Sequence, residues 1–592
     1  MEKGRFLQIP SFSALVLVLT PILLSPLPVI VPGKESDCAF VILWVALYWI
    51  TGCLPLGVTS LLPVIVFTFM EILTLTEVTN AFFFNGIWLL LGSISLAIAA
   101  QTAQLHLRIS LKILLLIGTS PKRLLFGFML VTYFLSMVIS NVVITAMMIP
   151  IVEGVIEEMK QQEKYGKNKN LHECMVLEEK HSNQSNAEIE HLPEDTHMDT
   201  EMRNLAKGLT MCIPYASSIG GVASLTGTWV NIIVVTVLKA SFPRSEEIGF
   251  ATWFFYCFPA SLITFVVAYF WLMWLYFGIS HPRMWFKRRD KSIDATKILL
   301  EGEYVKLGPI RWKEKWVLAV FCVTLFLWFT RRPGFMPGWS QLIDGKYVND
   351  GVVALTTVFI LFLIPQEKPT IFTSKTYRKQ QRKRSKSILS WFDIQKYFIW
   401  ELIFIVGAGL TLAEGAKKSG LSTYLANQLS FLVNYPPWLA CLCLSLFGMA
   451  ITECTSNTAV TNIMLPILVK VAVAMRVHPY YICLPTVLSV SLAFMLPVAT
   501  PANAVAYSSG HFKIVDMLKA GWFLNLVGVL FITLSINTYG VVFFNLNQYP
   551  DWANIQNQTN VLPGNAKRKI FFLILKIVTE FCSQCGCTGK QH

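Results

Sequence analysis

Apolar residues gather along this chain in separate blocks that are divided by polar connections. The blocks hold between 13 and 32 residues, and at a rise of ~1.5 Å per residue a helix of about 20 residues crosses ~30 Å of hydrocarbon. The pattern predicts an all-α polytopic membrane protein with about eleven transmembrane helices. The blocks cover residues 13–31, 38–69, 82–100, 124–155, 253–279, 316–330, 352–365, 398–413, 438–450, 460–474, 481–497 and 522–544.

The composition excludes a soluble protein. Hydrophobic residues make up 54% of the 592 positions and charged residues 14%, whereas soluble domains carry about 25% charged residues. The 13 cysteines lack metal-ligand spacing and are expected to be buried small hydrophobic residues for the most part. No enzyme is expected, because His106, His478 and His511 lie near span ends, at the membrane interface, without paired carboxylates.

The net charge of +14 indicates membrane orientation, and no nucleic-acid partner is expected. Residues 366–396 hold nine basic and two acidic residues between two apolar blocks, which marks the cytoplasmic side. Residues 157–203 hold twelve acidic and six basic residues without an apolar period, which predicts a disordered cytosolic loop. The N-terminus would then be cytoplasmic. Asn557 heads a glycosylation sequon and would place the C-terminus outside.

A short polar motif occurs twice within the apolar sequence. In each copy Ser-Asn is preceded, four residues earlier, by another hydroxyl, and the second copy lies 316 residues after the first. On a helix this spacing places both hydroxyl oxygens on one face, one turn apart. Transporter folds often consist of two halves related by inverted topology. The copies are Ser136, Ser140 and Asn141 in the first half, and Thr452, Ser456 and Asn457 in the second.

Both copies have the same two kinds of neighbour. Downstream lies a polar cluster with helix breakers that ends in Asn, at residues 225–231 and 497–503. Upstream lies a glycine-bearing block too short to cross the membrane twice, at residues 85–92 and 407–409. We therefore expect two inverted repeats, each with one re-entrant hairpin at its glycine block and one interrupted helix.

Interrupted helices inside a bilayer offer ligands for ions of both signs. Unwound segments present carbonyl oxygens, which together with Ser, Thr and Asn side chains suit a hard cation such as sodium, provided they line protein or a watery cavity. Helix N-termini attract anions. Ser, Thr and Gly also pack membrane helices closely, and close packing alone explains one motif equally well. Two copies with matching neighbours favour an ion site.

Three longer stretches resemble the divalent anion/sodium symporter family, of the solute carrier family 13 type. They are FTRRPGFMPGW at residues 329–339, TECTSNT at 452–458 and FMLPVATP at 494–501. The animal sodium–dicarboxylate and sodium–citrate cotransporters are the most similar branch, and the likeness extends from about Leu54 to Asn554. The resemblance implies sodium ions as coupled ions, a small di- or tricarboxylate anion as substrate, and a plasma-membrane homodimer whose transport parts move like an elevator in the lipid bilayer.

The resemblance also implies two sodium sites and one substrate site. The first sodium site would comprise Ser136, Ser140, Asn141 and the Gly227 carbonyl, and the second Thr452, Thr455, Asn457 and Ala499. The substrate carboxylates would contact Asn141, Val142, Thr228, Asn457, Thr458 and Thr500. Among the carboxylates near the motifs, Glu401 and Glu414 are expected at hairpin ends, and Glu453 is the candidate for orienting the second site.

This chain departs from the family pattern beside these positions. Val142 stands where members usually have Thr, which removes a hydrogen bond worth ~1.5–3 kcal/mol to a charged group. Trp229-Val230 replaces a small residue and Pro, Ala502 replaces a Pro, and Gly52 replaces a Glu. Two alternatives stay open. One is a sodium–sulfate symporter, although Thr458 and Thr500 match the dicarboxylate branch, and the other is a transport-inactive regulatory member.

The order of these features predicts the domain organisation. Scaffold spans occupy residues 1–80 and 241–365, and a basic cytosolic loop occupies 366–396. The first repeat occupies residues 81–240, the second repeat 397–545, and a C-terminal tail 546–592.

Overall fold

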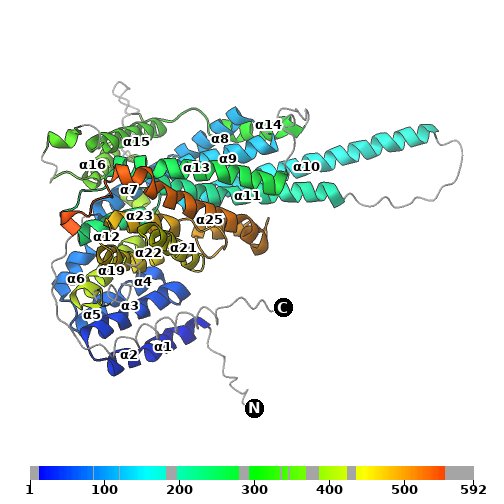
Figure 1. Cartoon of the computed structure of the whole chain (residues 1–592). Coiled ribbons are helices and arrows are strands. Elements are labelled where there is room, and N and C mark those ends of the chain that lie inside the picture. The colour runs from blue at the N-terminus through cyan, green and yellow to red at the C-terminus, as the bar shows by residue number, and fades with distance from the viewer. Residues whose placement is uncertain are drawn as a thin grey trace, which may run out of the picture.

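The computed structural model describes residues 12–84, 86–118, 120–181, 196–278, 292–333, 337–343, 347–368, 386–422, 424 and 435–553. Within these ranges the regular secondary structure is helical, apart from one isolated bridge between Pro365 and Ser387. Most helices pack around one large apolar core, and a second, smaller core joins the N-terminal helices to α19 (Glu401–Lys418) (Figure 1). The predicted all-α class is confirmed for the described residues.

The helices of the first half begin and end at residues suited to those positions. Thr74 and Glu77 form a capping box at the start of α6, and Pro121 opens α9. Gly52 ends α3 in the left-handed region, at φ +60°, where glycine has no steric cost. The helices are α1 (Phe12–Leu24), α2 (Pro26–Ile30), α3 (Lys34–Thr51), α4 (Leu56–Thr59), α5 (Leu62–Phe69), α6 (Leu75–Phe82), α7 (Ile87–Thr102), α8 (Leu105–Ile117), α9 (Pro121–Ser136), α10 (Asn141–His181), α11 (Thr196–Ala223) and α12 (Trp229–Ser241).

The second half repeats this use of proline at helix starts. Pro437, Pro479 and Pro501 open α21, α23 and α24, where the missing N–H is no loss. The helices are α13 (Phe250–Phe277), α14 (Ser292–Lys306), α15 (Trp312–Arg331), η2 (Trp339–Gln341), α16 (Asp350–Leu363), α18 (Trp391–Tyr397), α19 (Glu401–Lys418), α21 (Pro437–Thr452), α22 (Asn457–Ala474), α23 (Pro479–Val490), α24 (Pro501–Ser508), α25 (Ile514–Asn537), α26 (Tyr539–Phe543) and η4 (Asp551–Ala553).

Several helices are long and apolar enough to cross a membrane. Among the described residues there are five by length and composition, or six if the bent pair α18–α19 is one span. The five are Ser13–Ile30, Leu75–Thr102, Phe250–Phe277, Asn457–Ala474 and Ile514–Asn537. A multi-pass membrane protein is thereby confirmed, while the number of about eleven spans stays a prediction.

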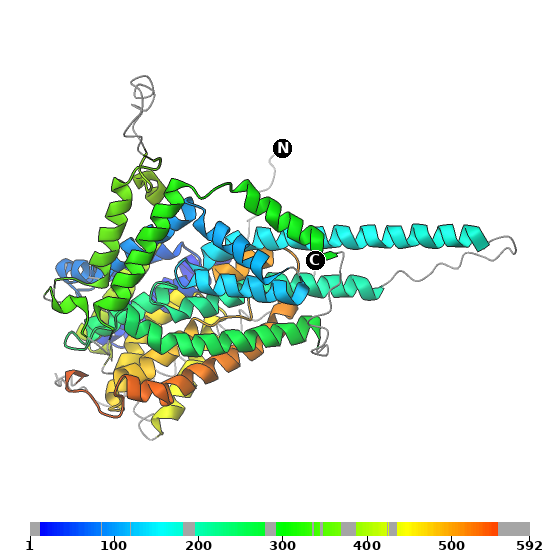
Figure 2. The ribbon, with the colours of Figure 1, turned by 90° about the horizontal axis from the view of Figure 1, so that it is seen from above.

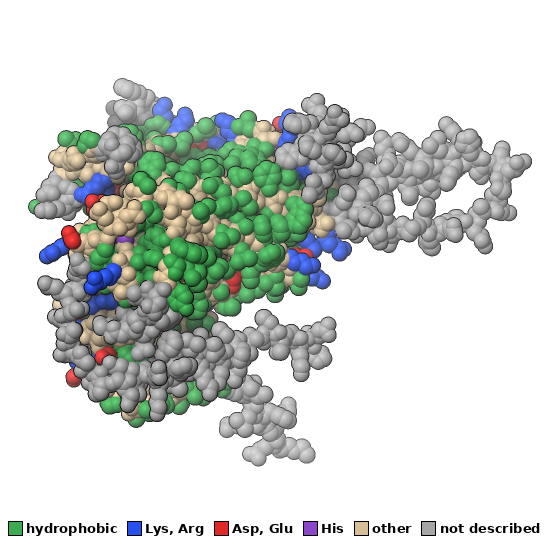
Figure 3. Space-filling model, viewed as in Figure 1, with side chains coloured by type: hydrophobic (Ala, Val, Ile, Leu, Met, Phe, Trp, Pro, Cys, Tyr) green, Lys and Arg blue, Asp and Glu red, His purple; other side chains and the backbone are tan. Residues whose placement is uncertain are grey.

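One face of the molecule shows the surface expected of lipid contact. Hydrophobic side chains cover the middle of this face, and charged side chains gather toward its edges (Figure 3). Large apolar side chains are exposed along α13, including Leu262, Val266 and Phe270, and along α25, including Leu530 and Leu534. Exposed apolar surface on this scale is stable in a bilayer and not in water.

The two halves repeat one helix arrangement and then interlock. In the first half α11 packs against α9 and α10, and in the second half α23 packs against α21 and α22. Across the halves, α10 packs against α24 and α12 packs against α22. Each helix that starts at a Ser-Asn motif therefore packs against the helix downstream of the other motif.

The glycines at 407 and 409 are helix-packing positions, and the re-entrant hairpin expected at this block stays a prediction. Gly407 and Gly409 lie inside α19, where an added Cβ would fall 2.6 Å from the Phe82 ring and 2.3 Å from Asn462 Oδ1. Near this block the chain bends by 63° at residues 398–400, between α18 and α19. Here the glycines allow membrane helices to approach each other closely. The sequence alone does not distinguish a glycine that packs against a neighbouring helix from one that lies in a turn.

The acidic stretch 157–203 is largely helical, and the disordered loop predicted there is wrong for its two ends. Helix α10 continues to His181 and α11 begins at Thr196. Figures 1 and 2 show the cyan end of α10 extending from the body beside the start of α11. A helix already formed in the membrane propagates readily through good helix formers such as Glu, Lys and Met.

The first stretch that resembles the symporter family contributes an ion-pair network to the fold. Arg331, at the end of α15, is 1% exposed, and its Nε lies 2.5 Å from Asp350 Oδ1. Its Nη2 lies 3.4 Å from Glu247 Oε2. These contacts join the ends of α15 and α16 to the segment before α13, so this motif holds helices together away from the Ser-Asn turns.

Some sequence predictions concern residues outside the described ranges. Asn557, the expected glycosylation site, is one of them, as are residues 369–385 of the basic run and the tail from 554 onward.

Candidate functional site

The first Ser-Asn motif lies at a turn between two helices. Helix α9 ends at Ser136, residues 137–140 form the turn, and α10 begins at Asn141. The Ser136 hydroxyl oxygen lies 2.6 Å from Asn141 Oδ1 and 2.5 Å from the Ser217 carbonyl oxygen of α11. Ser140 Oγ is buried and has no hydrogen-bond partner among the described residues. Several uncharged oxygens therefore lie close together in a buried place.

The second motif has the same geometry. Helix α21 ends at Thr452, residues 453–456 form the turn, and α22 begins at Asn457. The distance from Thr452 Oγ1 to Asn457 Oδ1 is again 2.6 Å. Thr455 Oγ1 is buried and, like Ser140 Oγ, has no hydrogen-bond partner in the described part of the chain. The hydroxyl-to-Asn contact is thus the same in both halves, whereas the buried hydroxyls without a described partner stand one and two residues before the Asn.

The two polar clusters downstream are unwound segments, each fixed by its final Asn. Asn231 Nδ2 donates to the carbonyl oxygens of Gly221 and Ser224, at 3.0 and 2.7 Å. Asn503 Nδ2 donates to the carbonyl oxygens of Ala493 and Leu496, at 2.9 and 3.1 Å. In both halves the acceptors lie ten and seven residues before the Asn. These two asparagines are positioning residues that the predicted site omitted, although their place at the end of each cluster was a usable signal.

The residues after the unwound segments also match. Thr228 has φ −138° and ψ 148°, and Thr500 has φ −139° and ψ 146°. Each is the N-cap of a helix, α12 or α24. Thr228 and Thr500 therefore have equal backbone geometry at equivalent positions of the two halves.

The turn and the unwound segment of the first half lie in direct contact. A Cβ added to Gly227 would fall 2.5 Å from the Gly221 carbonyl oxygen and 2.9 Å from the Ser136 carbonyl oxygen. One added to Gly221 would fall 2.5 Å from Asn141 Oδ1. Ser136, Asn141 and Gly227, predicted as one sodium site, are therefore brought together, and only glycine fits at 221 and 227 without displacing its neighbours.

The second half makes the corresponding contact through Asn457. Its Nδ2 lies 3.5 Å from the Ser491 carbonyl oxygen, at the start of the unwound segment. Ala499 occupies the place of Gly227 and is 1% exposed. We name the residues around each turn the first half-site (Ser136, Ser140, Asn141 and Gly227) and the second half-site (Thr452, Thr455, Asn457 and Ala499).

Glu453 fixes the unwound segment of the second half. Its carboxylate accepts hydrogen bonds from the backbone N–H groups of Phe494, Met495 and Leu496, at 3.0, 3.0 and 3.2 Å. Asn525 of α25 also donates to it. The side chain is 3% exposed, and a buried carboxylate is stable only when paired or hydrogen-bonded in this way. The suggestion that Glu453 orients the second half-site fits this geometry, whereas Asn525 was missed.

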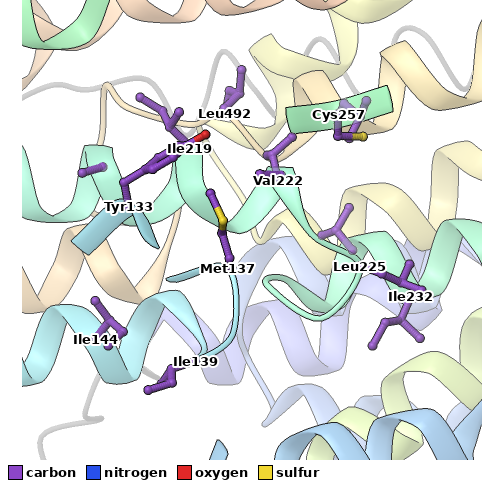
Figure 4. Close-up of a cluster of buried hydrophobic side chains, with 14 of the residues drawn as sticks. Tyr133, Met137, Ile139, Ile144, Ile219, Val222, Leu225, Ile232, Cys257 and Leu492 are labelled. Atoms are coloured by element: carbon purple, nitrogen blue, oxygen red, sulfur yellow. The ribbon is translucent and has the colours of Figure 1, made fainter. Parts of the chain in front are cut away.

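The first half achieves the same connection without a charge. Met137 occupies the position of Glu453, and its carbonyl oxygen accepts hydrogen bonds from the Ser224 hydroxyl and, at 3.4 Å, from Thr226 Oγ1. Figure 4 shows Met137 and Ile139 on this turn, with Ile144, Leu225 and Ile232 nearby. These apolar side chains are buried, so they keep water away from the surroundings of the first half-site and lower the local dielectric.

The positions predicted to contact substrate lie at four helix starts. Val142 and Thr458 are second residues of α10 and α22, and Thr228 and Thr500 are the N-caps of α12 and α24. All four are partly exposed. Because α10 packs against α24 and α12 against α22, each packed pair takes one helix from each half. Helix N-termini carry free N–H groups and positive dipole ends, which suit anions.

The other ionisable groups singled out from the sequence have structural partners. Glu401 Oε1 accepts from the Gly57 N–H at 2.7 Å, and Glu414 Oε2 lies 3.8 Å from Lys417 Nζ. His106 and His478 are each 5% exposed and therefore buried within the protein, while their position at the membrane interface stays a prediction. Burial lowers the pKa of both imidazoles to about 4, which leaves them neutral at pH 7.

The half-sites offer the right ligands for a hard monovalent cation. Hydroxyl, amide and carbonyl oxygens suit such ions, whereas transition metals prefer imidazole and thiolate ligands. Within the described residues, no group of three or more His, Cys, Asp or Glu side chains could hold a metal ion. Sodium therefore fits the residues present.

Comparisons with known proteins agree with this geometry. The family model described as the sodium:sulfate symporter transmembrane region matches residues 8–546. The Na(+)/citrate cotransporter of Rattus norvegicus is 39% identical over 568 residues, covering 92% of this chain and 97% of that protein. The Na(+)/dicarboxylate cotransporter 3 of Mus musculus is 38% identical over 565 residues, covering 91% and 94%.

A third relative is solute carrier family 13 member 2 of Homo sapiens, which is 37% identical and covers 94% of this chain and 97% of that protein. These relatives are transporters, so the expectation that the chain is no enzyme is supported. The family resemblance drawn from the three motifs is confirmed. The chain belongs to the sodium:sulfate symporter family.

Proposed function

We propose that this protein is a sodium-coupled symporter that carries small di- or tricarboxylates, of the succinate and citrate class, across a membrane. The observation that carries the proposal is the pair of 2.6 Å contacts between a hydroxyl oxygen and an Asn side-chain oxygen, one in each half. The relatives named as Na(+)/citrate and Na(+)/dicarboxylate cotransporters support the choice of ion and substrate.

Each half-site holds one sodium ion in this proposal. Ser140 Oγ and Thr455 Oγ1, buried without a described partner, turn to the cation and gain the interaction that they otherwise lack. The carbonyl oxygens of Gly227 and Ala499 complete the two shells.

The substrate anion lies among the four helix starts. Asn141, Val142 and Thr228 contact it from the first half, and Asn457, Thr458 and Thr500 from the second. The hydroxyl of Thr500 accepts from the Asn503 N–H at 3.2 Å, which leaves its own proton free for a carboxylate. The dipoles of the helices and the adjacent sodium ions stabilise two negative charges.

The order of binding follows from electrostatics. Sodium enters first, fixes the two turns and supplies positive charge beside the helix starts. A dianion then binds, and the loaded carrier moves. If three sodium ions travel with two negative charges, one net positive charge crosses per cycle, and the membrane potential contributes ~2.3 kcal/mol per 100 mV.

The proposed architecture has about eleven transmembrane helices in two inverted repeats, with the N-terminus cytoplasmic and the C-terminus extracellular. The interlocked packing of α10 with α24 and of α12 with α22 supports a compact transport part that moves as one body. A homodimer in the plasma membrane, with an elevator-type movement of each transport part, completes the proposal.

Uptake into proteoliposomes tests the function. Labelled succinate, citrate and sulfate are offered with an inward sodium gradient, or with potassium in place of sodium. We expect sodium-dependent uptake of succinate and citrate, and at least ~10-fold weaker uptake of sulfate, since ~1.4 kcal/mol of selectivity gives that factor. Stronger uptake of sulfate than of succinate and citrate would show that the substrate is sulfate and not a di- or tricarboxylate.

Thermal unfolding in detergent distinguishes a transport-inactive member. A protein that binds sodium and a dianion unfolds at a higher temperature in their presence. Absence of any sodium-dependent stabilisation by the three anions, together with absent uptake, would contradict the proposal.

A further inference from the structure

At two equivalent positions the halves carry different side chains, and both differences make the first half more apolar than the second. The residue after the motif Asn is Val142 in the first half and Thr458 in the second. The first helical residue after the N-cap Thr is Trp229 in the first half and Pro501 in the second. In both cases the first half carries the more apolar side chain.

Val142 and Trp229 flank one and the same half-site. Val142 follows Asn141, whose side chain meets Gly221, and Trp229 lies two residues after Gly227, which meets the Ser136 carbonyl. The starts of α10 and α12 are therefore held close together by the contacts of the first half-site.

Both side chains retain exposed surface. Val142 is partly exposed, and it packs against neither hydrophobic core formed by the described residues, whereas the adjacent Val143 packs against the larger core. Trp229 packs against the larger core and still keeps exposed surface. A valine that faces away from the core at the start of α10 is available to a ligand.

We infer that Val142 and Trp229 form an apolar wall at one end of the substrate site and give this carrier a preference for alkyl-substituted over hydroxyl-substituted dicarboxylates. This inference rests on the proposed function. Val and Thr have nearly the same shape, so Val142 changes the chemistry of the wall and not its volume. A hydroxyl on the substrate finds no hydrogen-bonding partner on the Val142 side chain, whereas a methyl group that packs against Val142 and the Trp229 ring is removed from water.

The second half-site keeps the opposite character, with hydroxyls at Thr458 and Thr500 for one carboxylate. The two ends of the substrate site consequently differ. The preferred substrate places one carboxylate at the polar end, and a second carboxylate with an adjacent alkyl branch at the apolar end. Methylsuccinate and malate are a matched pair of probes, because a methyl group in one takes the place of a hydroxyl in the other.

The test is competition of methylsuccinate and malate against labelled succinate uptake, in sodium, by the wild-type protein. We expect methylsuccinate to compete at a ~10-fold lower concentration than malate, combining the gain of a buried methyl group with the loss of a hydrogen bond. Equal potency, or a preference for malate, would overturn the inference. Succinate uptake would be intact in either result, so the proposed function is judged separately by succinate uptake itself.

Four substitutions test whether Val142 and Trp229 cause the preference. Val142→Thr should reduce the preference to about twofold or less, since it restores a hydroxyl, while Val143→Thr, the adjacent control, should leave it unchanged. Trp229→Phe should keep the preference because it keeps the ring, and Trp229→Pro, which copies the second half, should lower it. An equal effect of Val143→Thr, or loss of the preference in Trp229→Phe, would contradict the wall.

If a variant fails to fold, thermal stabilisation of the wild-type protein by methylsuccinate and by malate, each in sodium, gives the same comparison. A larger stabilisation by methylsuccinate is expected, and a larger one by malate overturns the inference.

Discussion

In the first half of the chain, the turn after α9 is joined to its unwound segment through the carbonyl oxygen of Met137 and two hydroxyl groups. In the second half, the carboxylate of Glu453 makes that connection through three backbone N–H groups. The hydroxyl-to-Asn contact and the final-Asn hydrogen bonds are the same in both halves. The shared contacts define what the half-site does, and the different ones define how each copy is held in place.

Because of this difference, the two half-sites also differ in the charge that surrounds them. Glu453 adds a negative charge one residue after Thr452, and a charge in surroundings of low dielectric acts more strongly than one in water. The first half-site has Met137 there and is surrounded by buried apolar side chains. We therefore expect the second half-site to bind its sodium ion more tightly than the first.

The largest expected effect tests what the halves share. Asn141→Ala and Asn457→Ala each remove an amide that lies 2.6 Å from a hydroxyl oxygen and begins a helix. Both should reduce sodium-driven succinate uptake at least ~100-fold, a loss of about 2.7 kcal/mol, with the protein still delivered to the membrane. Uptake and surface labelling measure the two quantities. Normal uptake by either variant would remove that Asn from the site.

The second prediction tests what differs. Glu453→Ala leaves the N–H groups of Met495 and Leu496 and the Asn525 amide without an acceptor, whereas the Phe494 N–H keeps Asn525 Oδ1, at a cost on the order of 3 kcal/mol in unfolding free energy. It should also raise the sodium concentration for half-maximal uptake. Met137→Leu, at the equivalent position, should change neither quantity much, because the first half uses the backbone carbonyl there.

Glu453→Gln refines this test. Gln keeps the shape of the side chain and one acceptor oxygen, so its unfolding temperature should lie between those of the wild type and Glu453→Ala. If Glu453→Gln and wild type show the same sodium dependence, the charge of Glu453 does not act on the second half-site.

The sequence predicted the parts of the site that depend on local spacing. The hydroxyls of Ser136 and Thr452 reach the Asn that starts the next helix. The expected helical spacing of the paired hydroxyls is wrong, because α9 ends at Ser136 and α21 at Thr452, which leaves Ser140 and Ser456 in the turns. The helix breakers downstream predicted unwound segments, which are present at residues 224–228 and 491–500.

The sequence did not predict what depends on contacts between distant helices. Gly409 lies against Asn462 of another helix, and only that neighbour shows that it serves packing and not a turn. Asn525 donates to Glu453 across 72 residues, a pairing that no local pattern encodes. The helical end of α10 depended on a helix started elsewhere, because isolated helices of such composition are marginal in water.

A third prediction concerns the final asparagines, where the halves should respond alike. Asn231→Ala removes hydrogen bonds to one carbonyl oxygen at the end of α11 and one in the unwound segment, and Asn503→Ala removes two to the unwound segment of the second half. Each substitution should cost about 2 kcal/mol in unfolding free energy. Thermal unfolding in detergent measures both. A difference of more than about 1 kcal/mol between the two variants would show that only one segment depends on its Asn.

The smallest effect has a distinctive sign. Ser140 Oγ and Thr455 Oγ1 are buried without a described hydrogen-bond partner, and such a group destabilises a protein by about 1 kcal/mol or more. Ser140→Ala and Thr455→Val should therefore raise the unfolding temperature in sodium-free buffer and lower the further rise that sodium produces. Thr210→Val, which removes another buried hydroxyl without a described partner from α11, should raise the unfolding temperature in sodium-free buffer and leave the further rise with sodium unchanged.

If the hydroxyls serve packing alone, Ser140→Ala and Thr455→Val will behave like Thr210→Val. If the second half-site binds sodium more tightly, Thr455→Val will lose more of the sodium response than Ser140→Ala.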